Sequence, residues 1–186
     1  PLPRRGDATR RLVTRGSELN AFLSRRVAQP APTWAVVSSF VLSLVGLGVS
    51  IYLTIAHFAG AQILACSSTG AIDCRAVTTS PQSYFLGVPV AILGLAFYVL
   101  MVAINSPWAW RATRNALHVA RLALVVGAMG FVLWLVGAEL LIINHICLYC
   151  TGVHVVTFAL LIVVTRVAPK QLTRNAFAPD EESVVN

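Results

Sequence analysis

Charged residues are scarce in this chain of 186 residues. They make up 11% of it, and only seven residues are Asp or Glu, whereas 57% are hydrophobic. A soluble domain of this size cannot bury so much apolar surface, because much of any folded surface stays in contact with water. The composition therefore excludes an ordinary soluble globular domain and indicates a chain embedded in a lipid bilayer.

A nucleic-acid-binding pattern is also missing, although the net charge is +7. Basic patches that bind nucleic acid carry interleaved aromatic or polar side chains on one face, and no segment has this pattern. Internal repeats and low-complexity blocks are absent as well. We therefore expect the bilayer, and no nucleic acid, among the partners of this protein.

Four long apolar segments are present. They cover about residues 34–57, 88–104, 117–143 and 147–167, and the second is near the short limit for a crossing. With a rise of about 1.5 Å per residue, each covers most of a hydrocarbon core about 30 Å thick. We predict an all-α integral membrane protein with a four-transmembrane-helix bundle at residues 34–168, an extracytoplasmic loop at 58–87, and polar tails at 1–33 and 169–186.

Lys and Arg are nearly absent from one side of this predicted bundle. Thirteen of the fourteen lie before the first helix, around the connection between the second and third, or near the end of the fourth; the exception is Arg75. Because basic residues stay in the cytoplasm, we expect a multi-pass protein of the cell (inner) membrane with both termini cytoplasmic. Trp108 and Trp110, in the inner connection, are expected to anchor the chain at the membrane interface.

Small residues recur at helical spacing in two of the predicted helices. They are Ser39, Ser43, Gly46 and Ser50 in the first, and Ala123, Gly127, Gly130 and Gly137 in the third. Small side chains let membrane helices approach closely. Helix packing is therefore the favoured interpretation, and a substrate path is the alternative.

The chain has only four cysteines, and the predicted topology puts all of them at one membrane face. Cys66 and Cys74 lie in the outer loop, and Cys147 and Cys150 form Cys-Leu-Tyr-Cys at the outer start of the fourth helix. Outside the cytoplasm disulfides persist. Two cysteine pairs at one face of a small bundle indicate either redox chemistry or structural cross-links.

The Cys-x-x-Cys pair favours redox chemistry. A helix N-terminus stabilises a thiolate, and a disulfide closed over so short a loop is readily exchanged. The loop pair and the helix pair together predict a relay from an external dithiol to an electron acceptor. Two alternatives remain: inert disulfides that staple the loop, and a four-thiolate zinc site, for which only Cys147 and Cys150 have the usual spacing. We expect no metal.

This order of cysteines resembles the vitamin K epoxide reductase family. The resemblance covers residues 34–168 and rests on the segments 66–74, 87–90 and 146–150, with Ser80 six residues after the loop pair. DsbB-type oxidases have the two pairs in the reverse order. Some bacterial relatives carry a fused thioredoxin-like domain, and this chain shows none, so we expect a separate redox partner.

The resemblance implies a role for each of these residues. A reduced DsbA-like thioredoxin-fold protein would attack Cys66, Cys74 would pass the reducing equivalents to Cys147, and Cys150 would stand beside a membrane quinone of the menaquinone or ubiquinone type. Ser80 would orient the loop or the quinone. The implied function is quinone-dependent thiol–disulfide oxidoreduction that supports disulfide formation outside the cytoplasm. Alternatives are net reduction of vitamin K quinone or epoxide, and a non-catalytic membrane scaffold with structural disulfides.

Two polar residues in the apolar segments are further candidates for the functional site. His154 shares a helix face with Cys147 and Cys150, being seven and four residues further on. It stands where vertebrate members have a Tyr, and their quinone-bonding Asn aligns with the apolar stretch 88–91. His154 either donates a hydrogen bond to a quinone carbonyl or relays a proton during its reduction, or it bonds to a neighbouring group of the protein. Glu139 is the only acid in an apolar segment, where a charge is costly; it is either a proton relay or a protonated hydrogen-bonding group between helices.

Overall fold

Three long apolar helices form the main body of the molecule. The computed structural model describes residues 31–60, 63–66, 70–111 and 115–176. Helix α2 covers Thr33–Ala59, α6 covers Asn115–Ala138, and α7 covers Leu148–Ala176. Within these elements, the segments that are long and apolar enough to cross a membrane are Thr33–Ala59, Ala116–Ile143 and Leu148–Val167. The prediction of a mostly helical protein with apolar, membrane-crossing segments is confirmed for these three.

The remaining apolar helix, α4, is short. It covers Val90–Ile104, which is 15 residues, or about 22 Å at 1.5 Å per residue. Pro89 precedes its first residue and Asn105 follows its last. Since a hydrocarbon core is about 30 Å thick, α4 is shorter than a full crossing, and the fourth transmembrane segment stays a prediction.

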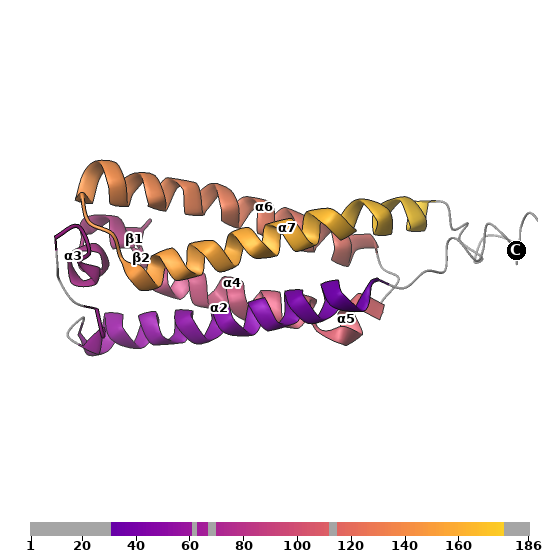
Figure 1. Cartoon of the computed structure of the whole chain (residues 1–186), viewed down its shortest axis with the longest axis horizontal. Helices are drawn as coiled ribbons and strands as arrows, with labels where there is room; N and C mark the ends of the chain where they lie inside the picture. The colour runs from indigo at the N-terminus through magenta and orange to yellow at the C-terminus, as the bar shows by residue number, and fades with distance from the viewer. Residues whose placement is uncertain (1–30, 61–62, 67–69, 112–114, 177–186) are drawn as a thin grey trace, which may run out of the picture.

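The four apolar helices lie alongside one another (Figure 1). Helix α2 packs against both α4 and α7, and α6 packs along α7, whereas α4 and α6 contact each other far less. The bundle is therefore tightly closed on three sides and looser between α4 and α6. The fourth apolar segment, predicted at about residues 147–167, agrees with Leu148–Val167, and helix α7 continues beyond this segment to Ala176.

The small residues of α2 form its buried face, as predicted. Ser39, Ser43, Gly46 and Ser50 are all among the buried residues of this helix. The closest approach is at Gly46, where an added Cβ would lie 1.9 Å from a ring carbon of Tyr98 on α4. Only a residue without a side chain fits between the helix and this ring.

The small residues of α6 behave differently. Gly127 and Gly130 are exposed, and a Cβ added at either position or at Gly137 would meet no atom within 4 Å. Ala123 is exposed as well. Within this chain the packing prediction is therefore wrong for α6, because α4 does not press against this face.

The end of the bundle opposite the cysteines is held by a buried arginine. Arg121 of α6 is 1% exposed and donates a hydrogen bond to the carbonyl of Ile104, the last residue of α4. Its guanidinium carbon lies 3.7 Å from the ring centroid of Trp110, on the short helix α5 (Pro107–Arg111). The interface-anchor prediction is therefore wrong for Trp110, which is buried beneath this cation; Trp108 is 81% exposed.

The long connection between α2 and α4 is folded. It contains helix α3 (Cys74–Thr78), the short 3₁₀ helix η2 (Pro81–Ser83), and a hairpin of β1 (Tyr84–Phe85) and β2 (Val88–Pro89). Its two-residue turn has positive φ at Leu86 (51°) and Gly87 (81°), as a tight hairpin of this kind requires. The outer loop is thus a small cap over one end of the bundle (Figure 1).

Candidate functional site

The loop cysteines are joined in a disulfide at the base of the cap. Cys66 and Cys74 are bonded, with their Cα atoms 6.0 Å apart. Cys74 is the first residue of α3, which begins there because the Asp73 carboxylate accepts a hydrogen bond of 3.0 Å from the Ala76 N–H. Cys74 is 1% exposed, whereas Cys66 is half-buried. Of the two sulfurs, that of Cys66 is therefore the more accessible from outside.

The helix cysteines are free thiols at the first turn of α7. Cys147 immediately precedes the helix, and its sulfur accepts a hydrogen bond of 3.3 Å from the backbone N–H of Cys150. The Cys150 thiol also donates to this sulfur and lowers the pKa of Cys147, against the opposing effect of burial. The prediction that a helix N-terminus would stabilise a thiolate in this motif agrees with this geometry.

A short backbone bridge holds the two cysteine pairs together. The Ile146 N–H donates to the carbonyl of Ala71 at 2.9 Å, and the Asp73 N–H donates to the carbonyl of Ile146 at 3.2 Å. These bonds immediately precede Cys74 on one segment and Cys147 on the other. Each pair of cysteines is thereby fixed relative to the other by main-chain contacts.

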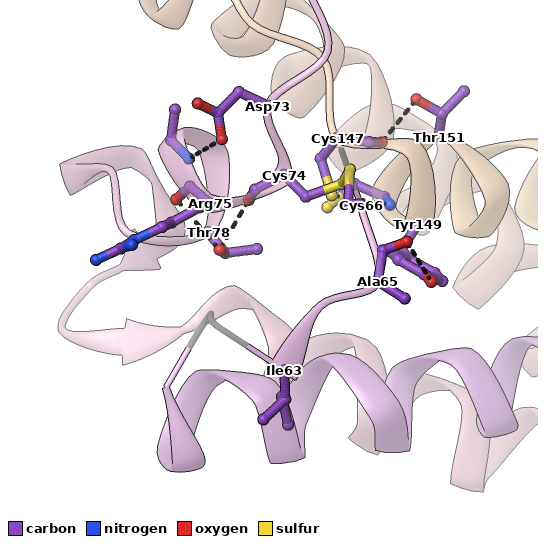
Figure 2. The surroundings of a disulfide bond; sticks show 12 residues. Ile63, Ala65, Cys66, Asp73, Cys74, Arg75, Thr78, Cys147, Tyr149 and Thr151 are labelled. Carbon is purple, nitrogen blue, oxygen red and sulfur yellow. Dashed lines mark hydrogen bonds between the residues drawn. A yellow bond between two sulfur atoms is a disulfide. The ribbon is translucent and has the colours of Figure 1, made fainter. Parts of the chain in front are cut away.

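All four cysteines meet in one apolar cluster. Cys74 and Cys147 are buried members of it, and Cys66 and Cys150 pack against it. Figure 2 shows Cys147 beside the disulfide of Cys66 and Cys74. The predicted grouping of the four cysteines at one end of the bundle is therefore confirmed. Two of the four sulfurs are bonded to each other, which is unlike the four thiolates of the zinc alternative.

A cavity of about 780 Å³ lies beneath the cap, with a wall contributed by α2, α4, α6, α7 and the hairpin. This volume is within the range of small-molecule and cofactor sites, about 300–1,000 Å³. Most of the wall is apolar. Of the four cysteines, only Cys150 lines it, so the two thiols of the helix pair contact different surroundings: Cys147 the loop disulfide, and Cys150 the cavity.

Glu139 lies in the same wall, at a distortion of the helix. Residues Glu139–Ile143 form a π-helical turn, η3, at the end of α6, and such turns often occur at functional sites. Glu139 is 6% exposed, and its carboxyl group lies close to the backbone N–H of Cys147. Glu139 therefore contacts both the cavity and the cysteine that faces the disulfide.

His154 and Ser80 complete the predicted polar residues of the wall. Both line the cavity and both are at most 9% exposed. His154 follows Cys150 by one helical turn, which confirms that the two share a face. The Ser80 hydroxyl donates to the carbonyl of Val77 at 2.8 Å, which holds Ser80 to the end of α3, and its oxygen can still accept a hydrogen bond.

Several tyrosines near the site carried no recognisable pattern in the sequence. Tyr98 of α4 lines the cavity, and its hydroxyl lies 2.9 Å from the hydroxyl of Thr157 on α7. Tyr52 of α2 and Tyr149, inside the Cys-Leu-Tyr-Cys motif, both hydrogen-bond to the segment before Cys66. The one sequence signal that they share is a phenol hydroxyl at the edge of an apolar segment. Such a hydroxyl usually finds a hydrogen-bond partner when the ring packs among other side chains.

Comparison with known proteins agrees with the residues that make this site. Residues 37–165 match the model of the vitamin K epoxide reductase family, and this range contains all four cysteines and every polar residue of the cavity wall. A search of the curated proteins finds none that matches the chain. Because the family model spans well over half of the sequence, the chain belongs to the vitamin K epoxide reductase family, a family of membrane oxidoreductases that use quinones.

Proposed function

We propose that this protein is a quinone-linked thiol–disulfide oxidoreductase that oxidises a separate thioredoxin-fold dithiol protein. The observation that carries the proposal is the placement of the helix pair: Cys147 packs against the loop disulfide, and Cys150 lines a large apolar cavity. A pair with one thiol toward each side can receive electrons from the loop and release them into the cavity.

The thiol chemistry follows from thiolate attack. The external dithiol reduces the bond between Cys66 and Cys74 and becomes a disulfide itself. The Cys74 thiolate then attacks Cys147 in the oxidised helix pair and releases Cys150. Cys66 attacks Cys74 in turn, which restores the loop disulfide and leaves Cys147 and Cys150 reduced. The sulfurs of the structure, bonded in the loop and free in the helix, correspond to this last state.

The cavity fits a quinone by its volume, its apolar wall and its few polar groups. A bound quinone of the menaquinone or ubiquinone type accepts two electrons and two protons. Cys147 and Cys150 supply both when they close their disulfide. We propose that Glu139 carries the proton released at Cys147 to the cavity, since its carboxyl group reaches both, and that His154 donates a hydrogen bond to a quinone carbonyl.

We propose that this chemistry takes place at the extracytoplasmic face. The basic residues favour cytoplasmic termini, and α4, with the apolar hairpin before it, serves as the fourth and shortest crossing. With four crossings, the loop disulfide and the start of α7 lie on the same outer side. Short helices are accommodated by local thinning of the bilayer at modest cost.

The test is quinone reduction in sealed right-side-out vesicles that contain the protein. A reduced DsbA-like protein added outside should reduce a menaquinone or ubiquinone analogue, followed by ultraviolet absorbance, and the same protein enclosed within the vesicles should not. Activity only with the enclosed dithiol would contradict the orientation. No quinone reduction from either side would contradict the function.

Substitutions of two polar residues of the cavity wall should distinguish quinone binding from proton transfer. Glu139→Gln keeps the shape and hydrogen bonding of the side chain but cannot carry a proton, so kcat should fall by about 10²-fold with little change in KM. His154→Phe should instead raise the KM for quinone by about tenfold, through one lost hydrogen bond to the ligand. Steady-state quinone kinetics measure both. An unchanged kcat in Glu139→Gln would assign Glu139 to helix packing, and an unchanged KM in His154→Phe would do the same for His154.

A further inference from the structure

Two tyrosines hold the residue that precedes Cys66. The Ala65 N–H donates a hydrogen bond of 3.1 Å to the hydroxyl of Tyr52, and the Ala65 carbonyl accepts one of 3.2 Å from the hydroxyl of Tyr149. The second bond is drawn in Figure 2. Tyr52 also donates to the carbonyl of Ile63 at 2.8 Å. Both main-chain groups of Ala65 are therefore bonded to side chains.

The two tyrosines come from different helices and pack against each other. Tyr52 belongs to α2, and Tyr149 lies between the two cysteines of the α7 motif. Their ring centroids are 5.0 Å apart, with the planes tilted by 58°. The segment that leads into Cys66 is thereby attached to both helices at once.

The other loop cysteine is positioned by separate contacts. Cys74 begins α3 and follows the backbone bridge between Ile72 and Ile146, which holds it beside Cys147. The loop disulfide thus has one sulfur fixed by main-chain pairing and the other by the two tyrosines. In thiol–disulfide exchange, access and position determine which sulfur of the disulfide is attacked. These contacts therefore influence whether Cys66 or Cys74 is the target.

We propose that Tyr52 and Tyr149 form a clamp that directs Cys147 to Cys74 and keeps Cys66 for the external dithiol. The proposal rests on the exchange between the two pairs in the proposed function, but on neither the quinone nor the partner. The exchange is reversible, and from the state of the structure it runs opposite to the electron flow of the proposed function. The Cys147 thiolate attacks the sulfur of Cys74, the bond between Cys74 and Cys66 breaks, and Cys66 leaves as a thiolate that takes a proton from water. Without the clamp, Cys66 moves and becomes an equal target.

The test uses a Cys150→Ser background, in which Cys147 has no resolving partner on its own helix. After acid quenching and alkylation, peptide mass spectrometry measures how much of the Cys147-containing disulfide joins Cys74 and how much joins Cys66. With both tyrosines present, the bond to Cys74 should dominate. In the Tyr52→Phe/Tyr149→Phe variant, the share of Cys66 should rise at least about fivefold, since even one lost hydrogen bond of this kind shifts an equilibrium by roughly that factor.

Tyr84→Phe is the matched control. Its hydroxyl also lies in the cap and hydrogen-bonds to His57, at 3.2 Å, but it makes no hydrogen bond to the segment before Cys66. The share of the Cys147 disulfide that joins Cys66 should therefore stay unchanged. Phenylalanine keeps both rings of the clamp, and thermal unfolding provides a second readout. If the double tyrosine variant is less stable but the fraction of Cys147 bonded to Cys66 is unchanged, the proposed clamp is wrong. A failure of Cys147 to bond with either loop cysteine in any variant would overturn the exchange itself, and with it the proposed function.

Discussion

Replacement of Cys150 by serine should abolish quinone reduction. Cys150 is the cysteine that lines the cavity, and with it the helix pair loses its route for releasing two electrons. The rate should fall by more than about 10³-fold, because loss of a reacting nucleophile costs at least this much in other enzymes. Stopped assays of quinone absorbance with an external dithiol measure the loss directly.

Binding in the same variant separates lost chemistry from a lost fold. A serine hydroxyl fits where the thiol was, so a quinone analogue should still bind Cys150→Ser, followed by quenching of tryptophan fluorescence. Trp134 is a suitable reporter, since its ring lies 5.8 Å from that of Phe85 in the cavity wall. A variant that retains more than a tenth of the normal rate would show that Cys150 is not the cysteine that serves the cavity.

Gly46→Ala should be the most destabilising single methyl addition in the bundle. The new Cβ would lie 1.9 Å from the Tyr98 ring, and this ring cannot easily turn aside because its hydroxyl is bonded to Thr157 and to the carbonyl of Val153 on α7. Overpacking of this kind costs about 1–3 kcal/mol. Thermal or denaturant unfolding in detergent measures the cost.

Gly48→Ala on the same helix is its control. A Cβ there would meet no atom within 4 Å, and alanine favours a helix over glycine by up to about 1 kcal/mol. The variant should be as stable as the original or slightly more so. In a Tyr98→Leu background, Gly46→Ala should lose most of its effect. Equal stability of Gly46→Ala and Gly48→Ala would contradict the close approach of α2 to α4.

The grouping of the cysteines was predictable because it depends on chain topology. The loop pair follows one apolar segment and the helix pair follows three, so two crossings separate them and return the chain to the same face. Local sequence also predicts that Cys147 stands at a helix N-terminus. The different surroundings of Cys147 and Cys150 were not predictable, because they depend on which helices border each thiol.

The small residues of the helices illustrate the same limit. Their spacing was equally regular in two segments, yet those of α2 are buried against Tyr98 and its neighbours, while Ala123 and Gly127 of α6 line the cavity. The alternative of a ligand path fits these two positions of α6. Spacing identifies a face of a helix, but only the arrangement of the neighbouring helices decides whether that face is packed or open.

The sequence by itself determined the membrane-embedded helical class, the family and the four cysteines, since long apolar segments and motif spacing are local properties of the chain. The tertiary structure decided which thiol faces the disulfide and which faces the cavity, how Arg121 closes the opposite end, and how two tyrosines hold the segment before Cys66. These features depend on contacts between segments far apart in the chain, and such contacts leave no periodic pattern in the sequence from which they could be inferred.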